Sequence, residues 1–212
     1  MENPLTDAAS PVHKPESAKA QHILAAAGTV FMREGFANAS VDEIVREADV
    51  SKSTVYAHFA GKEQLFAAVV GTQCQRLADA VSHGDSEVLP LRDALMEIGR
   101  RVLTLFLSPR GRAIFRIVIA EAPRFPELGR IFYQVGAELL HRRLSDFIAN
   151  AHGRNELVAP DPFIAAAHLI GLLKTDLQFR SMLFPDLEFE PAEIDRNVTL
   201  AVDAFLKIYG KP

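Results

Sequence analysis

The sequence predicts an all-α protein of about nine helices, with a small N-terminal three-helix domain that contains a helix-turn-helix and a larger C-terminal helical domain. Two observations predict this fold class. Residues 87–210 carry apolar side chains at helical spacing, with no alternating strand pattern and no strand-turn-strand signal. Helix-start signals, most of them a proline at the first helical position, recur between the apolar runs.

The chain of 212 residues divides into three segments. Residues 1–16 hold three prolines among small polar residues and read as a disordered tail. Residues 17–62 form the helix-turn-helix domain, and residues 63–212 form the helical C-terminal domain. The sequence has no apolar run long enough to span a bilayer and no secretory signal pattern at its N-terminus, so we expect a cytoplasmic protein.

The N-terminal domain is organised around two short helices. Ser40 and Glu43 have the spacing of a capping box and start the first of them. Ser51 is the expected N-cap of the second, which runs from Lys52 to Phe59. A longer helix precedes the pair and ends before Gly35, the expected left-handed residue.

The helices that follow have recognisable starts. One begins after Gly61 and ends near Val81, with a segment boundary at residues 83–86. The later helices begin at these signals: Pro90, Ser108-Pro109, Pro126, Asp161-Pro162 and Pro191.

The short helix from Lys52 has two different faces. Val55 and Phe59, four residues apart, are expected to pack into the core. Its other residues, Lys52, Ser53, Thr54, Tyr56 and His58, form a small hydrogen-bonding face with one fixed positive charge. Such a helix suits the major groove of a DNA duplex, where its first residues meet base edges and phosphates.

Charge gives weaker support for nucleic-acid binding. The net charge is −4. Residues 1–70 contain six Lys or Arg and nine Asp or Glu, a balance of −3. Residues 50–62 nevertheless contain two lysines and no acid. Because phosphate contacts dominate affinity, we expect modest non-specific binding.

The stretch SVDEIVREADVSKSTVYAHFAGKEQLF, preceded by ILAAAGTVFMREGFANA, resembles the DNA-binding domain of TetR-family transcriptional regulators. The resemblance covers about residues 18–66. It includes Phe31, Gly35 and Phe36, the SVDEI helix start, the VSKSTVY turn and Lys62-Glu63 at the next helix. The C-terminal half, with LRDALMEIGRRVLTLFL and FRIVIAEAPRFPELGRIFY, resembles regulators of multidrug efflux systems less specifically.

The resemblance implies DNA contacts at eight positions: Ser40, Ser51, Lys52, Ser53, Thr54, Tyr56, His58 and Lys62. Lys62 lies in the first turn of a helix, where exposed N–H groups and a lysine can hold a phosphate. Alternatively, Ser40 and Ser51 act only as caps and His58 only packs on Phe59. The tail is either without a role or a DNA-contacting arm.

The last two helices are apolar on two sides and so need two partners. A four-helix bundle built from two copies of this helix pair would make a two-fold homodimer. The expected interface residues are Leu169, Leu172, Leu173, Phe179, Val198, Ala201 and Phe205. The alternative is a monomer core covered by the preceding helices.

The resemblance also implies an effector cavity in the C-terminal domain. The candidate residues are Phe106, Phe115, Arg116, Ile119, Phe125, Phe132, Tyr133 and His168. Plain core packing is the alternative for the aromatic residues. A partly buried Arg116 would need a carboxylate or an anionic ligand, whereas a surface Arg116 could pair with Glu121. His168 could equally be a satisfied interface histidine.

Enzyme signatures are absent from the sequence: it has no phosphate-binding glycine loop, no GxSxG and no HExxH. We expect no cofactor and no metal. Cys74 is either a small core residue or a redox sensor. The sequence therefore predicts a repressor that binds a palindromic operator as a homodimer and is released by an unknown small-molecule effector. The alternative is a helical small-molecule-binding or adaptor protein whose helix-turn-helix no longer reads DNA.

Overall fold

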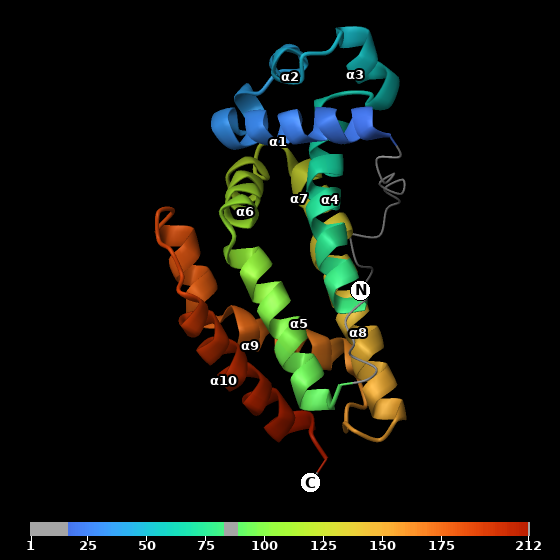
Figure 1. Cartoon of the computed structure of the whole chain (residues 1–212), viewed down its shortest axis with the longest axis vertical. Coiled ribbons are helices and arrows are strands. Elements are labelled where there is room, and N and C mark those ends of the chain that lie inside the picture. Colours follow the sequence, from blue (N-terminus) through green and yellow to red (C-terminus); the bar gives the residue numbers. More distant parts are fainter. Residues whose placement is uncertain (1–16, 83–88, 212) are drawn as a thin grey trace. The chain divides into compact units, whose positions relative to one another are not determined.

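The structure of the chain, a computed structural model, describes residues 17–82 and 89–211, without the side chains of residues 73, 74 and 76–82. Throughout this part the chain is helical and has no named strand, which confirms the predicted all-α fold (Figure 1). The predicted tail, the boundary at residues 83–86 and the side chain of Cys74 lie outside the described residues. The helices are α1 Ala18–Asn38, α2 Val41–Glu47, α3 Lys52–His58, α4 Lys62–Ser82, α5 Leu91–Leu107, α6 Pro109–Glu121, α7 Pro126–Phe132, the π-helical segment η2 Tyr133–Ala137, α8 Glu138–Gly153, α9 Pro162–Leu183 and α10 Pro191–Tyr209.

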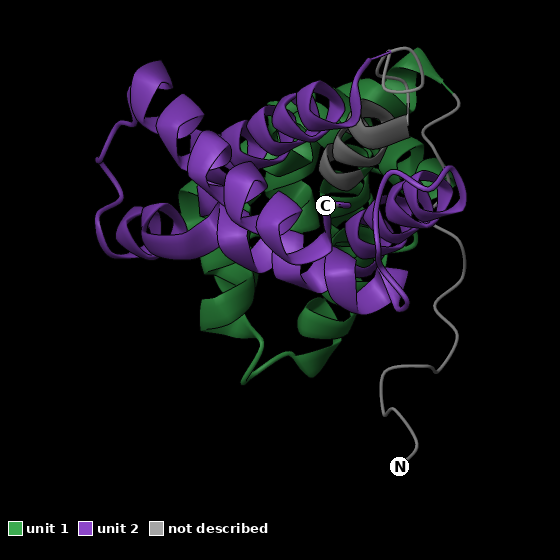
Figure 2. Cartoon of the chain, turned by 90° about the horizontal axis from the view of Figure 1, so that it is seen from below, with its two compact units in different colours: residues 1–75, 113–137 green, residues 76–112, 138–212 purple. Residues whose placement is uncertain are grey.

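The chain forms two compact units (Figure 2). Unit 1 contains residues 1–75 and 113–137, and unit 2 contains residues 76–112 and 138–212. Unit 1 therefore includes the start of α4, most of α6, and α7 with η2, in addition to the three N-terminal helices. The predicted functional boundary at residue 62 does not coincide with this division and stays a prediction.

Aromatic rings form the centre of unit 1. Phe36 stacks on Phe31 at 5.8 Å between ring centroids, and both rings meet the edge of Phe66 at 5.3 Å. Phe125 contacts Phe36 from a further side at 5.3 Å. Helices α2 and α3 lie on one side of α1 and α6 lies on the other (Figure 1). Because these rings are large and in edge or offset contact, they supply much of the stability of this unit.

Gly35 bends the end of α1. Its φ of +75° is a backbone conformation that glycine adopts most easily, as the sequence predicted. The chain then makes a further turn through Asn38, so α1 ends later than expected. Beyond the bend, the backbone N–H of Ala37 donates to Oε1 of Glu121 at 3.2 Å. This bond satisfies a group that the bend releases from the helical ladder.

Unit 2 is built from α5, α8, α9 and α10, and its core is an apolar cluster around Leu103, Leu144, Leu169 and Phe205. Helix α5 approaches its neighbours closely at Gly99. A Cβ at this position would lie 2.7 Å from Cγ1 of Val198 and 3.0 Å from Cδ2 of Leu173. Gly99 therefore allows the three helices to pack more closely than a larger residue would permit.

Helix α9 is interrupted at Thr175, whose φ is +24° and ψ is −134°. Asn197 of α10 compensates for the interruption. Its Nδ2 donates to the carbonyl of Leu173 at 2.8 Å, and its Oδ1 accepts from the Thr175 hydroxyl at 2.9 Å. The side-chain amide thus gives a backbone carbonyl and a hydroxyl group at the interruption a hydrogen-bond partner.

Candidate nucleic-acid interface

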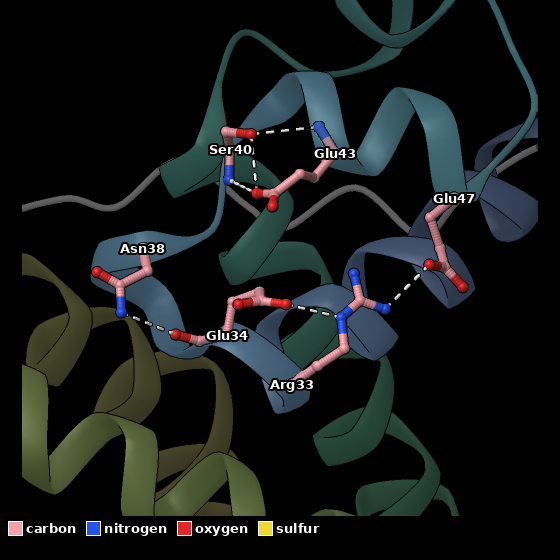
Figure 3. Close-up of polar contacts among 6 residues, drawn as sticks. All are labelled: Arg33, Glu34, Asn38, Ser40, Glu43 and Glu47. Carbon is pink, nitrogen blue, oxygen red and sulfur yellow. Dashed lines mark hydrogen bonds and ion pairs between the residues drawn. The ribbon is translucent and has the colours of Figure 1, made fainter.

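The capping box predicted at the start of α2 is present (Figure 3). The N–H of Glu43 donates to Oγ of Ser40 at 3.2 Å. In return, Oε2 of Glu43 accepts from both the hydroxyl and the backbone N–H of Ser40, each at 2.9 Å. The hydroxyl bond above all, and then the backbone bond, lower the pKa of Glu43. Ser40 therefore has a structural role as a cap, and its contact with DNA stays a prediction.

Two contacts fix α2 against α1. Arg33 reaches Glu47 at 3.1 Å and its neighbour Glu34 at 2.7 Å (Figure 3). These bonds, that to Glu34 first, raise the pKa of the guanidinium. At the same, C-terminal end of α2, Nε2 of His22 lies 2.8 Å from the carbonyl of the C-cap residue Ala48. Both contacts hold the end of α2 from which the turn continues, so the turn has a defined direction.

Three hydroxyl groups gather at the start of α3. Ser51 is the N-cap, and its Oγ accepts from the N–H of Thr54 at 3.1 Å. The same oxygen lies 2.9 Å from Oγ of Ser53 and 2.7 Å from Oγ1 of Thr54. Hydroxyls donate as well as accept, and can therefore contact either phosphates or base edges.

Helix α3 turns most of its polar residues to solvent, and Thr54 is half-buried. Val55 and the adjoining Phe59 are buried, as predicted. Tyr56 is 49% exposed, and His58 is exposed beside the ring of Phe59, at 6.3 Å between centroids. A seven-residue helix is unstable alone, so its two buried residues are what hold it in place.

Lys52 has a partner that the sequence analysis missed. Its Nζ lies 2.8 Å from Oδ1 of Asp42, in the first turn of α2, and both side chains are exposed. The hydrogen bond to Asp42 raises the pKa of Lys52. Asp42 is part of the quoted SVDEI helix start, but its distance from Lys52 depends on the turn between the helices.

Lys62 does not point freely outward from α4. Its Nζ donates to the carbonyls of Ala37 at 3.2 Å and Ala39 at 3.0 Å, and lies 4.6 Å from the centroid of the Phe36 ring. Lys62 therefore satisfies carbonyls at the end of α1 and ties α4 to them, and its contact with a DNA phosphate stays a prediction.

Comparison with known proteins places this arrangement in a family. Residues 23–69 match the family model described as bacterial regulatory proteins, tetR family. Residues 93–211, more than half of the chain, match the model described as the AefR-like transcriptional repressor, C-terminal domain.

The chain belongs to the TetR family of transcriptional regulators.

Individual relatives agree with this assignment. A TetR-family regulator from Mesorhizobium loti MAFF303099 is 31% identical, with 92% of this chain and 100% of that chain covered and a TM-score of 0.83. The Flavonoid-responsive Regulator FrrA is also 31% identical, with 91% and 97% covered and a TM-score of 0.75. The HTH-type transcriptional repressor SCO4008 of Streptomyces coelicolor is 35% identical over 83 residues, which span 39% of this chain and 43% of that repressor. This TetR-family chain is a transcriptional regulator and not an enzyme.

The predicted effector residues of this TetR-family protein are not brought together within either unit. Phe106 and His168 belong to unit 2, and the other six belong to unit 1. Phe125 is part of the aromatic core of unit 1, and Phe115 and Phe132 contact each other at 5.7 Å.

Three further candidates, Arg116, Ile119 and Tyr133, are exposed, which for Arg116 agrees with the surface alternative. The argument that a buried guanidinium needs an anionic ligand therefore does not apply. Nδ1 of His168 lies 2.6 Å from the hydroxyl of Tyr209 in the same unit. The location of the effector site stays a prediction.

Most of the predicted dimer residues need correction. Leu169, Leu173, Val198, Ala201 and Phe205 are buried in the core of unit 2 within a single chain, and their side chains are therefore not available to a partner. Leu172 packs partly against that core. Phe179 alone among the predicted seven is largely exposed, at 62%.

Within residues 17–82 and 89–211, every helix is too short or too polar to span a bilayer. Among the described side chains of these ranges, no three or more His, Cys, Asp or Glu residues are placed to hold a metal ion.

Proposed function

We propose that this TetR-family regulator is a repressor that binds a palindromic operator as a homodimer through the exposed face of α3, and that a small-molecule effector releases it. The observation that carries the proposal is the division of α3 into two faces. Val55 is 1% exposed, whereas Tyr56, the next residue, is 49% exposed beside exposed serine, lysine and histidine side chains. A buried anchor and a polar exposed face are what a helix needs to enter a major groove.

The exposed groups match the chemistry of a DNA duplex. Ser53 and Thr54 can donate to phosphate oxygens or to base edges, and the Tyr56 hydroxyl can donate to a phosphate. Lys52 supplies the positive charge. These contacts are proposed for unit 1 alone and require no particular placement of unit 2.

A homodimer is supported by apolar side chains that remain exposed on α9 and α10. Phe179 and Leu183, four residues apart on α9, are 62% and 56% exposed. Leu200 and Ile208 on α10 are 61% and 60% exposed. Residues four apart, or eight apart, lie on one face of a helix. Pairing of two such surfaces would remove these side chains from water.

Dimerisation has a direct test. Replacing Leu200 with glutamate places a charge on the proposed interface and is expected to give a monomer in sedimentation equilibrium. Val158→Glu is the matched control, since Val158 is 51% exposed in unit 2 but lies outside α9 and α10. Equal masses for both variants would contradict the proposed interface.

Release by an effector is supported by one relative. FrrA, whose whole length is nearly covered by the match, is named as flavonoid-responsive. We therefore propose that a small organic molecule lowers the affinity of this chain for its operator. Such a response requires the effector to bind the two conformations with different affinity.

The DNA contact is tested by electrophoretic mobility on the DNA upstream of the chain's own gene. The double variant Lys52→Ala, Tyr56→Ala is expected to weaken binding by about tenfold or more, because each lost charged or polar contact contributes on the order of 1 kcal/mol. Asn150→Ala, at an exposed position of α8, is the control that leaves binding unchanged. A wild-type protein that shifts no upstream or genomic fragment at low salt would contradict the proposal and favour a helical protein that no longer reads DNA.

A further inference from the structure

The acidic residues of α2 are engaged in different ways. Glu43 is bonded to Ser40 and Glu47 to Arg33, so both contribute to the frame that holds the helix-turn-helix. Asp42 instead reaches across the turn to Lys52 of α3, at 2.8 Å. It is therefore the acidic side chain of α2 that pairs with a residue of the proposed DNA-binding face.

Both partners are open to solvent. The side chain of Lys52 is 55% exposed and that of Asp42 is 66% exposed. An exposed ion pair between long or mobile side chains is worth little and exchanges readily with other partners. A phosphate carries a full negative charge and several acceptor oxygens, so it can replace the carboxylate as the partner of Lys52.

We propose that Asp42 is an internal competitor of DNA phosphate for Lys52, and that it sets the affinity of the helix-turn-helix for duplex DNA. The inference rests on the proposed DNA binding. In the free protein, Lys52 pairs with Asp42. In the complex, Lys52 pairs with a phosphate, and Asp42 is left without its partner beside a polyanion. Asp42 therefore lowers affinity for every sequence and keeps non-specific binding weak.

The segment of residues 50–62 is more positive in the sequence than its surface is in the fold. Residues 50–62 contain two lysines and no acid, which suggested a locally positive surface. In the fold, Lys62 donates to the carbonyls of Ala37 and Ala39, and Lys52 is paired with Asp42. The local charge available to DNA is therefore smaller than the sequence indicated, and removal of the Asp42 carboxylate would restore one positive charge.

The test is a cycle of four proteins: wild type, Asp42→Asn, Lys52→Ala and the double variant. Binding is measured by fluorescence anisotropy over a range of salt concentrations. The probes are a labelled duplex from upstream of the chain's own gene and a mixed-sequence duplex of equal length. Circular dichroism and thermal denaturation establish that each variant keeps its fold. Glu47→Gln is the control for charge, since it also removes one carboxylate from α2 but leaves the Lys52 pair intact.

We expect Asp42→Asn to tighten binding to both duplexes by about two- to fivefold. A change in affinity of this size corresponds to the free energies measured for exposed ion pairs. The slope of log K against log salt should become steeper by up to about 0.9, corresponding to one additional phosphate contact. The gain in DNA affinity from Asp42→Asn should be smaller in the Lys52→Ala background, where no ion pair has to be broken. Glu47→Gln should increase DNA affinity less than Asp42→Asn does.

Three results would overturn the proposal. Weaker binding of Asp42→Asn would mean that the carboxylate positions Lys52 for DNA. Equal gains with and without Lys52 would mean that Asp42 acts only as a negative charge near the duplex. Absence of binding by the wild type would remove the proposed function itself, and is distinguished from the other two results because it precedes any comparison of variants.

Discussion

Helices α3 and α9 both expose side chains to solvent, but the exposed side chains of α3 are polar and those compared on α9 are apolar. Helix α3 buries Val55 and exposes hydroxyl, imidazole and ammonium groups. Helix α9 buries a leucine stripe in unit 2 and yet exposes Phe179 and Leu183. A polar exposed face is stable in water and can exchange water for a polar partner, whereas exposed large apolar side chains gain free energy when a second apolar surface covers them.

The contrast shows that exposure alone does not identify a partner. The chemistry of the exposed side chains does so: the face of α3 fits a polyanion with polar groove edges, and the exposed residues of α9 and α10 fit another apolar surface. The cores of the two units differ from both surfaces, because core side chains already have all their partners within the same chain. Substitutions can therefore be ranked by whether they act on a core or on a surface.

The largest effect is expected from Phe36→Ala in the core of unit 1. Phe36 is 1% exposed and contacts three other rings as well as the ammonium of Lys62. Removal of a buried ring is expected to cost about 3–5 kcal/mol of unfolding free energy. Urea denaturation measures this loss.

Phe179→Ala is the matched control, since it removes the same ring from an exposed position. It should alter unfolding free energy mainly by weakening association, so its effect should depend on protein concentration. A loss of unfolding free energy of similar size in both variants at every protein concentration would contradict the division into core and surface residues.

A pair of glycines sharpens the comparison within unit 2. Gly99→Ala would place a methyl group 2.7 Å from a methyl of the buried Val198 and is expected to destabilise the chain by about 1–3 kcal/mol. Gly171→Ala, in α9, meets nothing within 4 Å and should stabilise it by about 0.5–1 kcal/mol through helix propensity. Thermal denaturation of the two variants measures these effects, and the midpoint temperature should fall for Gly99→Ala and rise for Gly171→Ala. Shifts of the same sign would refute the close approach at Gly99.

A smaller destabilisation than at Phe36 or Gly99 is expected at the capping box. Ser40→Ala removes the N-cap of α2 and is expected to cost about 1 kcal/mol. Because the folded state lowers the pKa of Glu43 from its ordinary value of 4.5, the contribution of this carboxylate is present above pH 4.5 and is lost as the pH falls through the lowered pKa. The difference in midpoint temperature between wild type and Ser40→Ala should therefore shrink at acid pH. A constant difference down to pH 2 would show that Glu43 takes no part in the cap.

Local signals in the sequence predicted most of the fold. The capping box at Ser40, the N-cap at Asp161 and the prolines that open α6, α7, α9 and α10 act within a few residues and are present where they were expected. Pro90, expected in the first turn of α5, is instead its N-cap. The positive φ of Gly35 and the burial of Val55 and Phe59 were predicted for the same reason. The π-helical segment η2 and the interruption at Thr175 have no such local signal.

Long-range pairings could not be predicted. The partners of Lys52 and Lys62 lie in other helices, and only the folded chain brings Asp42 or the carbonyl of Ala39 within reach. The choice of most dimer-interface residues was wrong for a related reason. A helix that is apolar on two sides needs two partners, but periodicity does not say which of them belongs to the same chain. For Leu169 and Phe205 the partner is the protomer's own core.

The central claim is that two copies of α3 face one DNA duplex, and a tethered cleavage reagent tests it most directly. An iron chelate is attached to Ser53→Cys in a Cys74→Ser background, and strand cleavage is mapped on the upstream duplex. We predict two clusters of cleavage about one helical turn, or ~34–36 Å, apart, and none when the chelate is attached to Asn150→Cys. Uniform cleavage from position 53, or equal cleavage from both positions, would contradict the account.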